Sequence, residues 1–213
     1  MRLVGALALI AGGFVLAGCE TGPPMSAAQC SVADWRAVGY QDGANGRAPE
    51  RFVALQQACA AAGMGADQTA YLRGRDEGLV TYCQPERGFR LGLEGNGYGG
   101  VCPPDLDIAF RYANEDGRRA YSALSALRSV ESTISSLRDE RATLERKIDA
   151  NEAGLVASQT DADRQRHRDE VIRLRDERNR LDDRLRDAEN DQRDRDRDVG
   201  RVRRDLGFRY GSW

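Results

Sequence analysis

The sequence predicts a mainly α protein, with a small disulfide-stapled helical head followed by a long coiled-coil extension that forms a hairpin or a dimer. Two observations lead to this prediction. All five cysteines of the 213-residue chain lie at or before Cys102, in a stretch rich in glycine and aromatic residues. From Tyr121 onward, apolar residues follow heptad spacing within a highly charged sequence.

Residues 1–18 are expected to be a lipoprotein signal peptide. Arg2 supplies a positive charge, and Leu3 to Val15 form an uncharged apolar run that is too short to span a bilayer. The following Leu16-Ala17-Gly18-Cys19 resembles the lipobox of bacterial lipoproteins, which are cleaved before the cysteine. Cys19 is therefore the expected lipidation site, because two or three acyl chains such as palmitate hold a protein stably on a membrane.

Residues 19–29 are expected to be a flexible tether, since Gly22-Pro23-Pro24 lies in a stretch without apolar periodicity. Glu20 follows the lipidated cysteine. In enterobacterial lipoproteins an aspartate at this position commonly signals retention in the inner membrane. Its absence favours a lipid-anchored protein of the cell envelope, on the periplasmic face of the outer membrane.

Residues 30–118 are expected to form a Cys/Gly-rich helical module. Gly39–Gly46 and Gly88–Gly95 share the spacing glycine-aromatic-x-x-glycine-x-x-glycine, and Tyr71–Gly78 repeats its Gly-x-x-x-Gly core. These glycines either form bare helix stripes, where another backbone can approach, or occupy turns with positive φ. Helices are favoured because residues 51–62 and 67–82 have helical apolar spacing. The expected helix boundaries lie at Pro49, Pro85, Pro103 and Pro104.

The cysteines of the head predict two disulfides. Lipidation of Cys19 would leave an even number of thiols in an oxidising compartment, namely Cys30, Cys59, Cys83 and Cys102. Four cysteines allow three pairings, among which we expect Cys30 with Cys59 and Cys83 with Cys102. In a head with so little core, each bridge typically contributes about 2 to 4 kcal/mol.

The head combines cysteines, glycines and aromatic residues at these positions: Asp34-Trp35, Gly39, Asp42-Gly43, Cys59, Tyr71, Gly74-Arg75, Gly78-Leu79, Tyr82-Cys83, Pro85, Gly88-Phe89, Tyr98 and Val101-Cys102-Pro103. This pattern covers about residues 30–118 and resembles the domain-of-unknown-function 2799 family of uncharacterised bacterial lipoproteins. The resemblance implies a place in the bacterial envelope. It implies no biochemical activity.

Residues 119–207 are expected to form the coiled coil. A first apolar seam, interrupted by Arg141, comprises Leu127, Val130, Ile134, Leu137, Leu144 and Ile148. A second seam, weakened by Arg178, Gln192 and Arg195, comprises Val171, Leu174, Leu181, Leu185, Ala188, Val199, Val202 and Leu206. Gly154 and the possible cap at Ser158–Asp161 indicate a break between the seams. An antiparallel hairpin is favoured, with a parallel dimer or a partly disordered charged helix as alternatives.

Charge patterning argues against nucleic acid as a partner. The net charge is −2, and residues 161–206 contain 15 arginines and 15 acidic residues. This mixture is typical of a solvated helix face with internal ion pairs. The aromatic tail, residues 208–213, is expected to pack its rings back on the helix, with a docking tip as the alternative.

The inventory of reactive residues argues against most catalytic sites. The only histidine, His167, lies outside the head, which excludes a Ser-His-Asp or Cys-His arrangement there. The cysteines lack the short spacings of zinc sites, and Gly95–Gly100 lacks the lysine of a phosphate-binding loop. Asp42 and Glu77 are the best-placed pair of carboxylates for glycan hydrolysis, although surface or capping roles are more common.

The sequence therefore predicts a non-catalytic cell-envelope lipoprotein with a binding or structural role that faces the periplasm. No cofactor, metal or catalytic residue is expected. The expected partners are the membrane, through the lipid anchor, and an envelope protein, the cell wall or a second copy, through the coiled coil. The alternative is a small periplasmic glycan hydrolase that uses Asp42 and Glu77.

Overall fold

The computed structural model describes residues 24–213, so the predicted signal peptide and lipidation site lie outside the described residues. The described part is helical and contains no strand, which confirms the predicted fold class. Its helices are α1 (Ala27–Ser31), α2 (Trp35–Ala44), α3 (Arg51–Ala61), α4 (Gln68–Tyr82), α5 (Pro85–Leu93), α6 (Pro104–Ala157) and α7 (Asp161–Tyr210).

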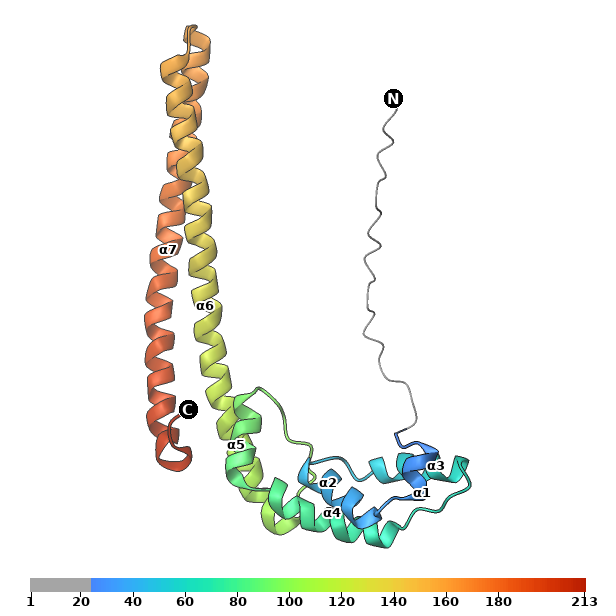
Figure 1. Cartoon of the computed structure of the whole chain (residues 1–213). Helices are drawn as coiled ribbons and strands as arrows, with labels where there is room; N and C mark the ends of the chain where they lie inside the picture. The colour runs from blue at the N-terminus through green and yellow to red at the C-terminus, as the bar shows by residue number, and fades with distance from the viewer. Residues whose placement is uncertain (1–23) are drawn as a thin grey trace, which may run out of the picture.

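The head consists of α1 to α5 and the first part of α6, and the hairpin consists of the rest of α6 together with α7 (Figure 1). Helix α6 passes from the head into the hairpin without interruption, so the predicted boundary at residue 118 falls inside a helix. None of the described helices is both long enough and apolar enough to cross a membrane.

Helices α2 and α4 pack in parallel, with their backbones in direct contact. A Cβ atom added to Gly39 or Gly43 of α2 would overlap the carbonyl oxygen of Tyr71 or Arg75 in α4. On the other side of the interface, Gly78 of α4 lies equally close to the carbonyl of Tyr40. The glycines are therefore interface residues, because any side chain there would force the helices apart.

Helices α5 and α6 repeat this arrangement. Gly88 and Gly92 of α5 lie against the backbone of Phe110 and Asn114, and Gly117 of α6 lies against the carbonyl of Phe89. We call α2 with α4 the first unit, and α5 with residues 104–121 of α6 the second unit.

The two units correspond residue by residue beyond their glycines. In each, a glycine with positive φ, Gly46 or Gly95, follows two residues after the end of the first helix and lies against the ring of Tyr82 or Tyr121 respectively. The residue after that glycine accepts a hydrogen bond from a buried side chain. Arg75 donates to the carbonyl of Arg47 at 3.0 Å, and Asn114 donates to that of Asn96 at 3.1 Å.

The predicted echo between Gly39–Gly46 and Gly88–Gly95 thus reflects equivalent helices. Tyr71–Gly78, which the sequence suggested as a third copy, is instead part of the partner helix α4. Its equivalent is Phe110–Gly117 in α6.

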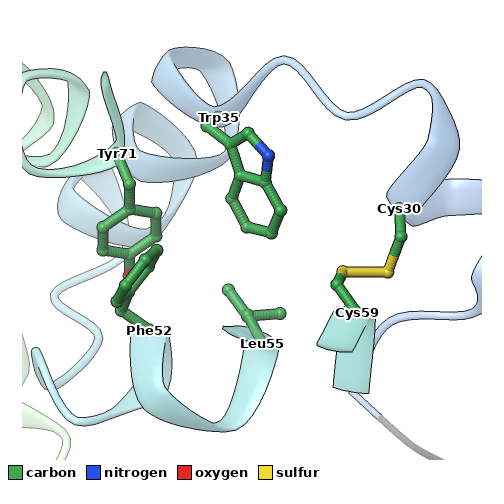
Figure 2. Packing of buried hydrophobic residues seen from close by; sticks show 6 residues of the cluster. All are labelled: Cys30, Trp35, Phe52, Leu55, Cys59 and Tyr71. Atoms are coloured by element: carbon green, nitrogen blue, oxygen red, sulfur yellow. A yellow bond between two sulfur atoms is a disulfide. The ribbon is translucent and has the colours of Figure 1, made fainter. Parts of the chain in front are cut away.

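Each unit is closed by one disulfide, Cys30–Cys59 in the first and Cys83–Cys102 in the second, in the pairing that the sequence favoured. Each bridge joins the segment before the first helix to the segment before the second. In the first unit, Trp35, Phe52, Leu55 and Tyr71 fill the space beside the bridge (Figure 2). In the second, Tyr82 stacks on Phe110 at a centroid distance of 5.2 Å and joins the two units.

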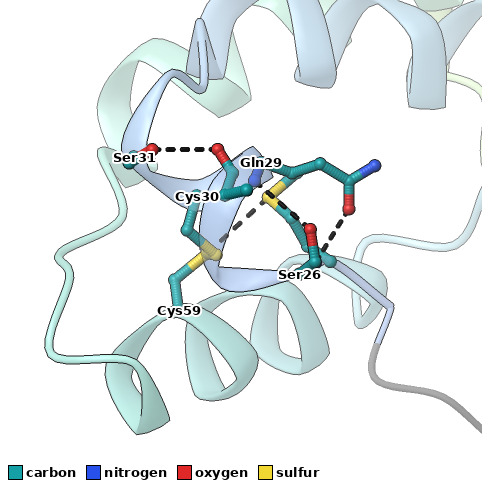
Figure 3. Close-up of a disulfide and its surroundings, with 7 residues drawn as sticks. Ser26, Gln29, Cys30, Ser31 and Cys59 are labelled. Atoms are coloured by element: carbon teal, nitrogen blue, oxygen red, sulfur yellow. Dashed lines mark hydrogen bonds between the residues drawn. A yellow bond between two sulfur atoms is a disulfide. The ribbon is translucent and has the colours of Figure 1, made fainter.

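The segment before the first unit is more ordered than the predicted tether. Ser26 and Gln29 form a capping box at the start of α1, so the last residues of the expected flexible segment are helical (Figure 3). Cys30 follows in the same helix, where the disulfide fixes α1 to α3. The isolated sequence conceals this helix because its five residues are too short to show periodicity.

Helices α6 and α7 form the expected antiparallel hairpin within one chain. Leu137, Leu144 and Ile148 pack against Val171, Leu174 and Leu181 near the turn. Arg141, which interrupts the first seam, pairs with Asp182 across the interface at 3.0 Å. The break is short, because α6 continues through Gly154 and Thr160 caps α7 by accepting a hydrogen bond from the backbone of Asp163.

We predict that Gly43→Ala destabilises the head by about 1 to 3 kcal/mol, because the added methyl group overlaps the backbone of α4. The gain in helix propensity, about 1 kcal/mol, is too small to compensate. Urea unfolding followed by circular dichroism measures the change. Gly65→Ala is the matched control, since no atom lies within 4 Å of the added carbon there. Equal stability of the two variants would contradict the packing.

Candidate functional site

The most elaborate surface contact of the head lies where the end of the chain returns to the second unit. The ring of Tyr210 stacks on Phe89, with a centroid distance of 4.2 Å and an interplanar angle of 7°. Trp213 approaches the same ring from its edge at 5.8 Å. Aromatic pairs in these geometries are stabilised by about 0.5 to 1.5 kcal/mol beyond their area burial.

A carboxylate beside Phe89 fixes the orientation of the tail. Asp116 of α6 accepts a hydrogen bond from the Tyr210 hydroxyl at 3.1 Å and pairs with Arg209 at 2.7 Å. Burial of the Tyr210 ring, followed by this hydrogen bond, raises the pKa of its hydroxyl. We call Phe89 and Asp116 together the Phe89 face.

Helix α7 and the residues after it deliver the tail to this face. Leu206 is fully buried in a cluster with Ala113 and Ala120 of α6, which fixes the last turns of α7 to the head. The helix ends at Tyr210, and Gly211 at φ +73° turns the chain so that Trp213 can reach Phe89. Two of the three rings of the tail thus pack back, but their principal partner is Phe89 of α5 rather than the helix that carries them.

Phe208 is the exception within the tail. Its side chain is 98% exposed, although Tyr210 and Trp213 beside it are partly buried. An exposed ring at this position contributes nothing to the packing of the tail on the head.

The first unit has an equivalent face that the tail does not cover. Tyr40 occupies the position of Phe89, since Gly78 and Gly117 contact the carbonyls of these two residues. Glu77 precedes Gly78 as Asp116 precedes Gly117. Tyr40 is 39% exposed and lines a shallow cleft, in which Glu77 is paired with Arg36 at 2.6 Å. Arg36, a residue of the first unit itself, therefore pairs with Glu77 as Arg209 of the tail pairs with Asp116 in the second unit.

The structure holds the two candidate catalytic carboxylates in separate ion pairs. Asp42 is buried, accepts from Arg51 Nε at 2.9 and 3.0 Å, and accepts from the Tyr71 hydroxyl at 2.8 Å. Glu77 lies at the surface with Arg36. Burial, followed by the bond to Asp42, raises the pKa of Tyr71. These contacts bind Asp42 into the fold of the first unit, and neither a hydrogen bond nor a shared ion-pair partner links the described side chains of Asp42 and Glu77.

A second, partly buried network holds the loop before α6. The Tyr98 hydroxyl donates to Asp107 at 2.6 Å and accepts from the backbone nitrogen of Cys102 at 2.8 Å. Burial and the bond to Asp107 raise the pKa of Tyr98 to about 12. Gly95 and Gly100 have positive φ, so the glycine-rich stretch turns the chain toward Cys102.

The hairpin contributes a long cleft but no cluster of reactive groups. Leu144 and Leu181 lie in a groove between α6 and α7 that charged side chains border. His167 lies at the turn of the hairpin, where it contacts Asn151 and packs over Gly154. Across residues 24–213, no group of three or more histidine, cysteine or acidic side chains is placed to hold a metal ion.

Residues 34–119 match the model of a family described as Protein of unknown function (DUF2799). The match supports the resemblance seen in the sequence, and its limits coincide with the two units: it begins at the residue that caps α2 and ends two residues before Tyr121. The hairpin and the tail lie outside it. No curated protein and no solved structure matches the chain.

We predict that Asp42→Ala lowers the free energy of unfolding by about 1 to 3 kcal/mol, because it leaves the buried Tyr71 hydroxyl without its acceptor and the half-buried Arg51 without its carboxylate. Glu77→Ala is the control and is expected to cost at most about 1 kcal/mol, since exposed pairs contribute little. Chemical unfolding of both variants measures the difference. Comparable small effects would contradict the structural role of Asp42.

We also predict that stability falls as the pH rises from about 10 to 12. In this range the unfolded state loses the Tyr98 proton, whereas the folded state keeps it because its pKa is raised to about 12. Below pH 10 both states keep the proton, so the stabilisation is fully present and does not change with pH. Urea unfolding at pH 9 and 11 should therefore show a smaller pH-dependent loss for Tyr98→Phe than for the unchanged chain. An identical loss in both would contradict the network.

Proposed function

We propose that this protein, whose head matches the DUF2799 family, is a non-catalytic, lipid-anchored lipoprotein of the bacterial cell envelope. Its hairpin would serve as a rigid arm with a binding or structural role on the periplasmic side, at the outer membrane. The lipobox at Leu16–Cys19 and the family match of residues 34–119 support this placement. The disulfides support it too, because they persist in oxidising compartments.

The observation that supports the arm most strongly is that the hairpin buries both of its apolar seams internally. Leu137, Leu174 and Leu181 are each at most 4% exposed without a second chain. The 50 residues of α7 extend about 75 Å at 1.5 Å per residue. A self-contained rod of this length can carry a contact far from the place where the head is anchored.

Ion pairs across the hairpin fix the alignment of its helices. They join Arg138 to Glu189, Arg141 to Asp182 and Arg175 to Glu152. Each exposed pair contributes at most about 1 kcal/mol, but a shift of one helix would break several together. The outer surface therefore presents a fixed pattern of arginines and carboxylates, which suits a partner of mixed charge.

The anchor is tested by labelling cells with a palmitate analogue and separating their membranes. Incorporation into the full-length chain and loss of label in Cys19→Ala are expected, together with fractionation in the outer membrane. Label that survives Cys19→Ala would contradict acylation at this residue. Recovery of the acylated protein in the inner membrane would contradict the sorting.

The arm is tested by photo-crosslinking in living cells from its exposed face, at Ser135 and Arg168. We expect crosslinks to an envelope protein, to the cell wall or to a second copy. Leu174, which is 1% exposed, is the matched control and should crosslink only within the chain. If Ser135 and Arg168, like Leu174, formed no crosslink outside the chain, a binding role of the arm would be contradicted.

A further inference from the structure

The tail covers a surface of the second unit that can be exposed to solvent in a folded unit. In the first unit the same helix pair is complete although Tyr40, the equivalent of Phe89, is 39% exposed. Phe89 is only 3% exposed, and two of its aromatic neighbours, Tyr210 and Trp213, come from the tail. The cover that the tail places over the Phe89 face is therefore an addition to the repeated design.

The chemistry of this face is specific. An aromatic ring offers a flat stacking surface, and a carboxylate beside it accepts both a hydroxyl and a guanidinium. Asp116 binds Tyr210 and Arg209 in this way, and its side chain is 15% exposed in the complex with the tail. In the first unit Glu77, the equivalent of Asp116, is already paired with Arg36 of the same unit.

The Phe89 face lies inside the family match, and the tail that covers it lies outside. Phe89 and Asp116 lie within the residues that match the family model, whereas Arg209, Tyr210 and Trp213 lie about 90 residues beyond its end. The occupant reaches the face only because the hairpin returns to the head. Leu206 of α7 packs in the same cluster as Phe89 and brings the end of the helix to the head, while Arg209, Tyr210 and Trp213 make the polar and aromatic contacts with the face.

We propose that the Phe89 face is a peptide-binding site for a protein segment that carries an arginine next to an aromatic ring. The tail of the chain occupies this site as an internal competitor, and a partner segment of the same chemistry replaces it. The tethered tail has an effective concentration of the order of millimolar, so only a partner that binds well or is itself held nearby displaces it. This site is independent of the lipid anchor and of contacts along the arm.

The test uses a fluorescent peptide with the sequence of residues 207–213 and two forms of the whole chain. One form is unchanged, and the other carries Arg209→Ala, Tyr210→Ala and Trp213→Ala, which remove the three side chains that contact the Phe89 face without shortening α7. Fluorescence polarisation should show saturable binding to the emptied form, at least tenfold tighter than to the unchanged chain. Circular dichroism checks that both forms keep the same helix content.

Matched variants distinguish specific binding at the Phe89 face from nonspecific binding of the peptide. In the emptied chain, Asp116→Asn should weaken peptide binding several-fold, whereas Glu77→Gln should leave it unchanged. A peptide with alanine in place of Phe208 should bind as well as the original, because Phe208 is 98% exposed, and one with alanine in place of Tyr210 should fail. The proposal is overturned if the folded, emptied chain does not bind at millimolar peptide, or if both chain forms bind equally.

Discussion

The head depends on the close approach of helix backbones, and this approach is possible only where glycines replace side chains. Gly43 on α2 and Gly92 on α5 each face a carbonyl of the partner helix, at distances that admit no Cβ atom. Helices that approach so closely bury little apolar side-chain volume between them, so a stable unit needs other constraints. One disulfide in each unit, which joins the segments before the two helices, supplies such a constraint.

The head contains two copies of one scaffold, and the surfaces of the two copies differ. The buried donor is Arg75 in the first unit and Asn114 in the second, although both reach the equivalent carbonyl. The surface ring is Tyr40 in one and Phe89 in the other, and only the second is covered. The hairpin grows out of the second unit and returns to it, so the unit that starts the arm also receives its end.

Much of this architecture could be predicted from patterns that are local in sequence. Heptad spacing indicated the hairpin, and apolar spacing with prolines indicated α3 to α5. The correspondence between Tyr71–Tyr82 and Phe110–Tyr121 was missed, because alanine at 113 replaces the glycine at 74 and asparagine at 114 replaces the arginine at 75. The contact between the tail and the Phe89 face could not be predicted, since only the length of the hairpin brings Tyr210 to Phe89 and Asp116.

The most direct test of this account is the distance between spin labels at Arg90, beside Phe89, and Ser212 in the tail. Both side chains are exposed, and labels introduced on non-natural amino acids leave the disulfides intact. In dilute monomer we expect a distance of the order of 10 to 20 Å, as for labels on adjacent helices. A straight extension from the head would separate the labels by more than about 100 Å, at 1.5 Å per residue. A distance beyond the measurable range would contradict a hairpin that returns to the head.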